Sequence, residues 1–339
     1  MTTPKVWFPA IRCGSGADVF TERLCYALKA QGIRTEITWL PHRAEYAPWT
    51  VPVPAPPDWA NVVHINSWLP QRFLPPELPV IVTVHSCVHD SALRPYKSRL
   101  QALYHQHWIY AIEAANIQRA RAVVAVSHYT AAQVRAHFGT HDITVIHNGI
   151  DCQTFTPTTR TTPHRPFRLL YVGNWSVRKG VDLLAPIMER LGGDFMLHYT
   201  ADRNSGHERF RLPANSVCLG RLKGGDLVRA YQEADALLFP SRLEGLPLVP
   251  LEAMACGLPV IATKGTSIEE VVAHGKTGIL CPRNDIHAFA DAARCMAIDR
   301  QLHLEYGREA RRDVMARFQD SMMVDAYVRA YRGLLGNGP

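Results

Sequence analysis

The chain has 339 residues, 47% of them hydrophobic and 20% charged, a composition that fits a soluble globular protein and excludes a disordered one. A chain of this length exceeds the size at which one hydrophobic core usually stops growing, so two domains are expected. The net charge of +7 favours a phosphate-bearing partner, but the basic residues are spread out and no RRM, KH or zinc-finger motif accompanies them, so no nucleic acid is expected.

Eight cysteines occur singly along the chain, at positions 13, 25, 87, 152, 218, 256, 281 and 295. This spacing predicts free thiols in a reducing compartment, with no disulfide framework and no metal site. The first residues lack the apolar stretch of a signal peptide, and no segment has the roughly 18–20 uninterrupted apolar residues of a membrane span. We therefore expect a cytoplasmic protein.

Strand-like apolar runs alternate with helical patterns through the first part of the chain. The expected strands are Val6–Pro9, Arg34–Leu40, Val62–Ile65, Val80–His85, Ala122–Ser127 and Ile143–Ile146. The expected helices are Asp18–Gln31, Lys97–Arg119 and Thr130–Phe138. Strands separated by helices indicate βαβ units and a largely parallel sheet.

The alternation stops at Thr156–Pro166, whose threonines, prolines and basic residues are typical of a linker. Beyond it, the expected strands are Arg168–Gly173, Asp194–Thr200, Ser216–Leu219, Ala236–Phe239, Pro259–Ala262 and Thr277–Leu280. The expected helices are Asp182–Leu191, Gly225–Glu233, Val249–Cys256, Ile268–His274 and Ile286–Ile298. A last helix, Gln319–Leu334, could pack on either domain.

The sequence therefore predicts an α/β protein with two Rossmann-like, doubly wound domains, residues 1–160 and 161–339, which face each other across a cleft. Ligands of such sheets bind beyond the carboxyl ends of the strands. Functional side chains are therefore expected in the loops that follow the strands.

Two glutamates flank a Gly-Leu-Pro turn in Ser241–Thr263, which reads SRLEGLPLVPLEAMACGLPVIAT. Glu244 lies in the loop after an expected strand, and Glu252 lies about one turn inside the next helix. Carboxylates there can accept hydrogen bonds from sugar or ribose hydroxyls, and amides at the helix start can hold phosphate. Taken alone, such a pair is as often two solvated acids without a function, one in a loop and one in a helix, as it is a binding site.

A second loop, Val172–Gly180, reads VGNWSVRKG and joins an expected strand to a helix. Arg178 and Lys179 stand at the start of that helix, where two cations and the helix dipole could stabilise a diphosphate. The alternative is a solvated cationic turn. The guanidinium can bind an anion through two nitrogens, whereas the ammonium acts as a point charge.

The first strand leads into Arg12-Cys13-Gly14-Ser15-Gly16-Ala17-Asp18, which joins it to a helix. A third glycine and an acid after the second strand are missing, so this loop is not a dinucleotide fingerprint. Gly16 allows close approach of the backbone to a ligand, or it serves only a tight turn.

Two histidines, His85 and His64, are expected at the ends of strands. A lone histidine is more often structural than functional. Histidine could also act as a general base, which would suit an inverting reaction.

Together these segments resemble the retaining family 4 glycosyltransferases of the GT-B fold, whose hallmark is a pair of glutamates separated by seven residues, as in EGLPLVPLEAMACGLPVIAT. AVSHYTAAQVRAHFG, VIHNGIDCQTFTP and LLYVGNWSVRKGVDLL resemble further family segments, so the resemblance covers nearly the whole chain. One departure is Asn174, at a position where the family most often has arginine; Arg178 could supply the missing charge.

The resemblance implies roles for the matched residues. Glu244 would contact hydroxyls of the transferred sugar and Glu252 the ribose, while His85 would touch the sugar. The candidates expected to act in catalysis are His85, Glu244, Lys179 and Arg178. Those expected to bind the donor are Gly16, Glu252, Gly245, Leu246, Pro247 and, through main-chain contacts to the base, Leu222. The acceptor-side candidates are Ser15, Asp18 and His64.

The implied function is the transfer, with retention, of a hexose-type sugar from a nucleoside-diphosphate sugar to a glycan or lipid-linked acceptor of cell-surface polysaccharide or glycolipid synthesis. No cofactor or metal is implied, and a UDP-sugar is the preferred donor. The alternatives on the same fold are a sugar-nucleotide epimerase and a non-catalytic sugar-nucleotide-binding protein. A phosphorylase would need a longer chain, and the glycine loop disfavours a nicotinamide dehydrogenase.

The segment Arg94–Arg121 combines cations with aromatic residues. Leu100, Leu103, His107, Tyr110 and Ala114 fall at helical spacing, which predicts one buried face. Its cations and aromatics also fit a helix at the inner face of the cell membrane, in peripheral contact with anionic lipid. The alternative is an ordinary core helix with a wet, charged face.

Overall fold

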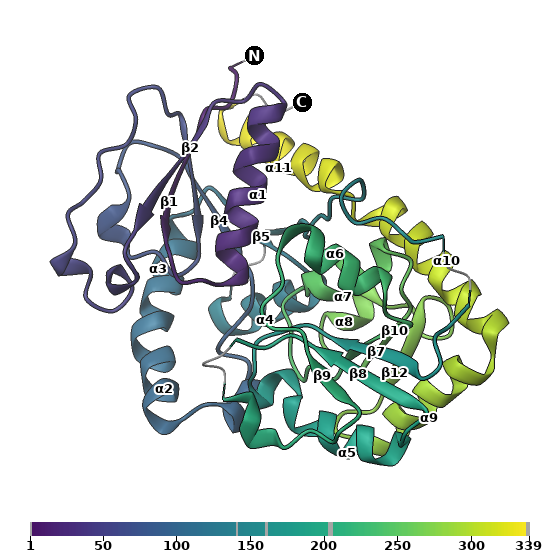
Figure 1. Cartoon of the computed structure of the whole chain (residues 1–339). Helices are drawn as coiled ribbons and strands as arrows, with labels where there is room; N and C mark the ends of the chain where they lie inside the picture. The colour runs from purple at the N-terminus through teal and green to yellow at the C-terminus, as the bar shows by residue number, and fades with distance from the viewer. Residues whose placement is uncertain (1, 140–141, 160–161, 203–205, 337–339) are drawn as a thin grey trace. The chain divides into compact units, whose positions relative to one another are not determined.

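The computed structural model describes residues 2–139, 142–159, 162–202 and 206–336, and these divide into two compact units. The first unit holds the described residues up to Gly149 together with those from Asp320 onward; the second holds Ile150–Gln319. Each unit contains a parallel six-stranded sheet flanked by helices, which can be followed in Figure 1. The α/β prediction is therefore confirmed for both halves of the chain.

The sheet of the first unit has the strand order β2-β1-β3-β4-β5-β6. Its strands are β1 (Val6–Ile11), β2 (Thr35–Leu40), β3 (Val62–Asn66), β4 (Val80–Val84), β5 (Ala122–Ala125) and β6 (Ile143–Val145). All six residues of β1 are buried, as expected for a strand covered on both faces. The chain leaves β1 toward β2 and returns on the other side to β3, so the topological switch point lies between β1 and β3.

The helices of the first unit are α1 (Gly16–Ala30), α2 (Arg99–Leu103), α3 (Tyr110–Arg119), α4 (His128–Phe138) and α11 (Asp320–Leu334). In Figure 1, α11, coloured yellow, lies beside α1. The terminal helix thus belongs to the first unit, which is one of the two placements that the sequence left open. Its buried residues recur at helical spacing and include Val324, Tyr327 and Tyr331.

The helical stretch expected over Lys97–Arg119 is interrupted by a π-helical segment, Tyr104–Ile109. The face that the periodicity predicted to be buried is exposed instead, with Leu100 at 81% and Leu103 at 53%. That prediction was wrong because the buried face of this stretch is partly polar. On it, the carboxylate of Glu113 is fully enclosed, and an apolar pattern does not detect such a face.

The sheet of the second unit has the strand order β12-β11-β10-β7-β8-β9. Its strands are β7 (Phe167–Tyr171), β8 (Phe195–Tyr199), β9 (Ser216–Cys218), β10 (Ala236–Phe239), β11 (Val260–Thr263) and β12 (Gly278–Cys281). All of them lie where the sequence predicted strands. The chain leaves β7 toward β8 and β9 and returns to β10, so the switch point lies between β7 and β10.

The helices of the second unit are α5 (Val181–Leu191), α6 (Gly224–Gln232), α7 (Leu248–Ala255), α8 (Ile268–Val271), α9 (Ile286–Ile298) and α10 (Arg300–Arg317). The sequence analysis missed α10, because charged residues dominate it and weaken the apolar pattern. A start signal was present: the Asp299 carboxylate accepts a hydrogen bond from the amide of Leu302 at 2.9 Å. Within the described ranges, every helix is too short or too polar to cross a bilayer.

The domain boundary expected between residues 160 and 161 falls outside the described residues. The structure divides the chain earlier, after Gly149. The amide of Ile150 donates to the carbonyl of Phe318 at 2.8 Å, and Arg311 of α10 donates to the carbonyls of Cys152 and Phe155 at 2.8 and 2.7 Å. These bonds hold the start of the second unit against the helix that the sequence did not predict.

Candidate active site

Glu244 lies in the loop after β10, at the switch point of the second sheet. Its Oε1 accepts hydrogen bonds from Lys179 Nζ and from Ser241 Oγ, both at 2.5 Å. Lys179 ends a short helical turn, Val177–Lys179, in the connection that follows the neighbouring strand β7. The structure therefore brings two predicted site residues into direct contact.

The electrostatics of Glu244 are set by two opposing effects. The side chain is buried, and burial alone would raise its pKa. Attraction from Lys179 and Arg178, with hydrogen bonds from Lys179 and Ser241, outweighs burial and holds the pKa of Glu244 below its usual value. The carboxylate is therefore ionised at neutral pH and can accept hydrogen bonds from hydroxyl groups.

Arg178 stands beside this ion pair. Its Nη1 donates to the carbonyl of Leu243 at 2.7 Å and lies 3.9 Å from Glu244 Oε2. Its side chain is 35% exposed, so part of the guanidinium still faces solvent. Both predicted cations thus lie at the start of α5, where the helix dipole adds further positive potential.

Gly180 allows the two loops to approach each other. Its φ is +76°, and a Cβ built there would lie 2.2 Å from the carbonyl oxygen of Pro240. A larger residue would therefore force apart the turn that carries Lys179 and the loop that carries Glu244. Glycine at this position is a requirement of the local packing as well as of the backbone conformation.

Arg242 is a site residue that the sequence analysis did not single out. Its side chain is 5% exposed and bonds both carboxylate oxygens of Asp182, at 2.6 and 2.7 Å. It also donates to Asn284 Oδ1 at 2.6 Å and to the carbonyl of Val177. Arg242 thereby fixes the loop of Glu244 to the first turn of α5. An arginine two residues before the first glutamate was the available signal.

Glu252 lies in α7 and is 6% exposed. Its Oε2 accepts a hydrogen bond from the hydroxyl of Tyr231 in α6 at 2.9 Å. Tyr231 was not predicted to belong to the site. Gly245, Leu246 and Pro247 are buried between the two glutamates, and Leu222 is half-buried just before α6.

In the first unit, His85 follows β4 and lies next to the end of β3. Its Nε2 is 2.8 Å from Asn66 Oδ1, and its ring contacts that of Phe20 edge-on at 4.6 Å. With the amide oxygen as acceptor, Nε2 carries the proton and Nδ1 keeps its lone pair. Burial lowers the pKa of His85 to about 4, so the imidazole is neutral at neutral pH.

The loop after β1 is held by Asp18. Its Oδ2 accepts hydrogen bonds from the amides of Cys13 and Gly14 at 2.9 and 2.7 Å, and its Oδ1 accepts one from Ser15 Oγ at 3.2 Å. Both acceptor-side candidates of this loop therefore stabilise the loop itself. A Cβ built on Gly16 would meet no protein atom within 4 Å, so the space beside that glycine is open.

His64, the third acceptor-side candidate, does not end its strand as expected, because β3 continues to Asn66. It is 2% exposed, and its ring nitrogens bond the hydroxyls of Tyr331 and Thr83 at 2.7 and 2.8 Å. Tyr331 comes from α11, which covers this part of the sheet. His64 is thus a core residue with both nitrogens bonded inside the fold.

Two family models match the chain. The model described as Glycosyltransferase Family 4 matches residues 57–154, and the model described as Glycosyl transferases group 1 matches residues 166–299. Glycogen synthase from Mycobacterium tuberculosis is 26% identical over an alignment of 298 residues, which covers 80% of this chain and 68% of that protein.

Solved structures also match the fold. Sucrose-phosphate synthase from Thermosynechococcus elongatus matches 99% of this chain and 100% of its own, with a TM-score of 0.82 at 20% identity. HepE from Anabaena, solved in complex with UDP and glucose, matches 97% of this chain and 100% of its own, with a TM-score of 0.73 at 16% identity. These similarities establish the fold.

The two family models together span most of the chain, and their matched segments include His85, Lys179, Glu244 and Glu252. The resemblance noted from the sequence is therefore confirmed, as is the GT-B fold with its two Rossmann-like domains. The chain belongs to the family 4 (group 1) glycosyltransferases.

Proposed function

We propose that this glycosyltransferase transfers a hexose-type sugar from a UDP-sugar to a glycan or lipid-linked acceptor, with retention of the anomeric configuration and without a metal ion. The product would be part of a cell-surface polysaccharide or glycolipid. The observation that carries the proposal is the contact of ionised Glu244 with Lys179 at the switch point of the second sheet.

Glu244 is suited to holding the transferred sugar. Its Oε1 already accepts two hydrogen bonds, while Oε2 lies 3.9 Å from Arg178, its one cationic neighbour among the described residues. Sugar hydroxyls are donors, and an ionised carboxylate binds them more strongly than a neutral acceptor would. Glu252, in turn, is the candidate for the ribose hydroxyls of the nucleotide.

The leaving group would be stabilised by Lys179, Arg178 and the start of α5. In the proposed reaction the bond between the anomeric carbon and the diphosphate breaks. The acceptor oxygen forms its new bond on the same face, and its proton passes to the departing diphosphate. Negative charge grows on that diphosphate, and preorganised cations stabilise such charge most effectively when they need not move. These groups would supply the positive charge that a divalent metal ion provides in metal-dependent transferases.

The choice of a UDP-sugar is supported by HepE, which was solved with UDP and glucose. Gly245, Leu246, Pro247 and Leu222 are proposed to orient the donor and its base, and the open space beside Gly16 suits a phosphate group. In the first unit, neutral His85 is proposed to hydrogen-bond the sugar. The acceptor-side role of Ser15 and Asp18 would be to keep their loop in place.

Peripheral contact with anionic membrane is proposed for the start of α2. Leu100 and Leu103 are exposed, and Arg94 and Arg99 lie close to them in the sequence. Exposed leucines beside cations are typical of helices that rest on anionic lipid. Flotation with anionic and with neutral vesicles tests this: binding to the anionic vesicles should be lost in the double variant Leu100→Ser and Leu103→Ser.

The transfer is tested by incubating the protein with UDP-, GDP- and ADP-sugars, with and without a lipid and glycan extract, in the presence of EDTA. Mass spectrometry should detect UDP and an acceptor whose mass has increased by one sugar. Glu244→Ala should abolish both products, whereas Glu189→Ala, at an exposed position of α5, should not. NMR of the new linkage should show the anomeric configuration of the donor.

Other outcomes would replace the proposal. An inverted linkage would remove retention, and activity that disappears with EDTA and returns with a metal would remove metal independence. An isomerised sugar without an acceptor would indicate an epimerase. Tight donor binding with no turnover on any acceptor would indicate a sugar-nucleotide-binding protein.

A further inference from the structure

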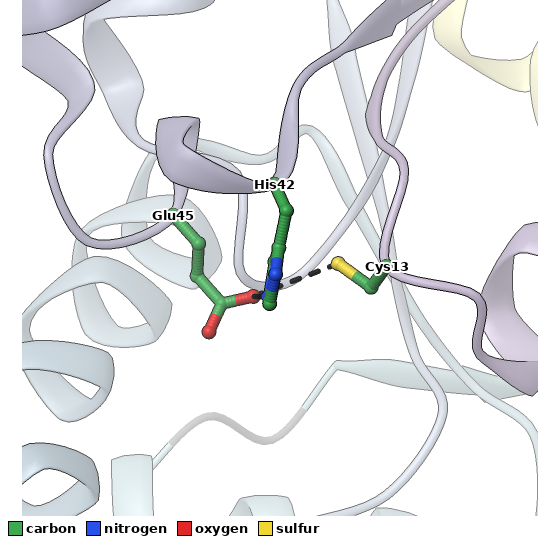
Figure 2. A group of neighbouring side chains, drawn as sticks. All are labelled: Cys13, His42 and Glu45. Atoms are coloured by element: carbon green, nitrogen blue, oxygen red, sulfur yellow. Dashed lines mark hydrogen bonds and ion pairs between the residues drawn. The ribbon is translucent and has the colours of Figure 1, made fainter. Parts of the chain in front are cut away.

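Three side chains that can bind metal meet at the carboxyl edge of the first sheet. They are Cys13, in the loop after β1, and His42 and Glu45, in the segment after β2. Figure 2 shows the Cys13 sulfur and the Glu45 carboxylate pointing toward each other, with the His42 ring beside them. Their ligand atoms all lie within 4.8 Å of one another.

From this arrangement we propose that Cys13, His42 and Glu45 form a binding site for a zinc ion. The site lies wholly inside the first unit, and none of its residues takes part in the transfer proposed above. The proposal therefore stands or falls independently of that function.

The distances suit a tetrahedral ion. Cys13 Sγ lies 3.7 Å from Glu45 Oε2, and His42 Nε2 lies 3.9 Å from the same oxygen. Ligand atoms about 2.0–2.3 Å from a tetrahedral zinc ion stand roughly 3.3–3.5 Å from each other. Small side-chain rotations would therefore close the site around the ion.

The backbone directs the three ligand side chains toward one point. His42 begins a 3-10 helix, His42–Ala44, and Glu45 follows three positions later. Side chains three residues apart eclipse each other in a 3-10 helix, so these two project in the same direction. Two bonds to Asp18, from the amides of Cys13 and Gly14, fix the loop that brings the sulfur opposite them.

Glu45 is also oriented by its neighbours. Its Oε1 accepts a hydrogen bond from the hydroxyl of Tyr104 at 3.1 Å, which leaves Oε2 directed at Cys13 and His42. Its carbonyl accepts one from Trp108 Nε1 at 2.7 Å. Hydrogen bonds of this kind hold metal ligands in position. His42 and Cys13 are exposed, so an ion can enter, and water can complete the coordination.

The set of ligands selects the metal. A thiolate and a carboxylate carry two negative charges, which balance a divalent cation, and the imidazole binds as a neutral ligand. Sulfur with nitrogen suits zinc, while magnesium and calcium need a set of oxygen ligands.

The test titrates zinc into the full chain, stripped of metal, in competition with a fluorescent chelator. We expect one ion per chain and a higher thermal unfolding midpoint with zinc, with no effect of magnesium. Cys13→Ser and His42→Gln should each weaken binding at least tenfold. The matched controls, Cys295→Ser and His287→Gln at exposed positions of α9, should bind as the parent does.

Cobalt provides a second readout. Bound at this site, it should give a near-ultraviolet thiolate-to-cobalt absorption that is absent in Cys13→Ser, and Tyr104→Phe should weaken its binding roughly tenfold. Failure of the parent chain to bind zinc would overturn the proposal. So would zinc binding that Cys13→Ser and His42→Gln leave unchanged, because the ion would then lie elsewhere.

Discussion

Arg242 and Asp182 form a two-point ion pair, in which both guanidinium Nη atoms lie 2.6–2.7 Å from the two carboxylate oxygens. The pair connects the loop after β10 with the first turn of α5. These are the two segments whose approach sets the distance between Glu244 and Lys179. Arg242 is therefore a positioning residue for the site.

Replacing this arginine should loosen the site and the fold together. We expect Arg242→Met to lower the free energy of unfolding of the second unit by about 2 kcal/mol, because Asp182 loses its partner. Activity should fall mainly through kcat, and Arg242→Lys should restore only part of it, because an ammonium cannot bond both oxygens in this way. Chemical denaturation and steady-state kinetics measure both effects. An unchanged kcat in Arg242→Met would contradict the positioning role.

Lys179 controls the charge of Glu244. In Lys179→Met the burial of Glu244 is no longer offset by its nearest cation, so the pKa of the carboxyl should rise. In the folded parent the pKa of Glu244 is lower than in the unfolded chain. The ionised carboxylate therefore stabilises the fold fully above the unfolded-state pKa, and this stabilisation is lost as the pH falls through the folded-state pKa.

The variant should therefore lose activity at a higher pH than the parent does. Its kcat at neutral pH should also fall by about 10²–10³, as expected for the loss of one leaving-group contact. A pH–rate profile measures both changes, with Lys29→Met at an exposed position of α1 as the control. Parallel profiles for the parent and Lys179→Met would contradict the electrostatic assignment.

Comparing Gly180→Ala with Gly139→Ala separates two causes of lost stability, which are backbone strain and steric conflict of the new Cβ. Gly180 and Gly139 have similar left-handed conformations, with φ of +76° and +65°. A Cβ at Gly139 would meet no atom within 4 Å, whereas one at Gly180 would lie 2.2 Å from Pro240 O. Gly139→Ala should cost about 1 kcal/mol from the backbone alone, and Gly180→Ala clearly more. Equal losses in denaturant unfolding would mean that the contact with Pro240 is unimportant.

Tyr231→Phe should weaken donor binding selectively. The variant removes the hydroxyl that donates to Glu252, at a cost of about 1 kcal/mol. We expect KM for the donor to rise roughly fivefold with little change in kcat, because ribose binding contributes equally to the ground state and the transition state. Tyr26→Phe, at a position that is 77% exposed, is the matched control. A loss confined to kcat would instead place Glu252 at the reacting centre.

The buried His64 should make the first unit sensitive to acid. Burial, with a smaller effect from His85, lowers the pKa of His64 to about 3 from its usual 6.5. The neutral form is therefore the folded form. Neutral His64 contributes fully to the free energy of unfolding above the unfolded-state pKa. This contribution is lost progressively as the pH falls from 6.5 toward 3.

Between these limits the free energy of unfolding should fall by about 1.4 kcal/mol per pH unit for this one group. His64→Gln should be less stable at neutral pH, because it disturbs the bonds to Tyr331 and Thr83, but its stability should depend less steeply on pH. Urea unfolding at several pH values tests this, with exposed His287→Gln as the control. An unchanged slope in His64→Gln would assign the acid sensitivity to other groups.

Local patterns in the sequence were sufficient for all twelve strands that the described residues form, and for the site segments around Glu244 and Lys179. Each strand or helix carries its own apolar period within a short stretch of sequence. An element can therefore be recognised without knowing its distant contacts. The pair of glutamates and the cationic turn could be found for the same reason. The helix α10 could not be recognised in this way, because charged residues dominate it and weaken its apolar pattern.

The sequence by itself therefore determined the strands, the two doubly wound sheets, the loops in which the site residues lie and most of the helices, with α10 as the one it missed among the described residues. Only the tertiary structure decided their partners: Arg242 with Asp182, Tyr231 with Glu252, and His64 in the core beneath α11 instead of at a strand end. The grouping of Cys13 with His42 and Glu45 belongs here too, since it joins the loop after β1 to the segment after β2. The physical reason is that periodicity records which face of an element is apolar, whereas the partner of a polar group depends on which strand ends the sheet topology places side by side.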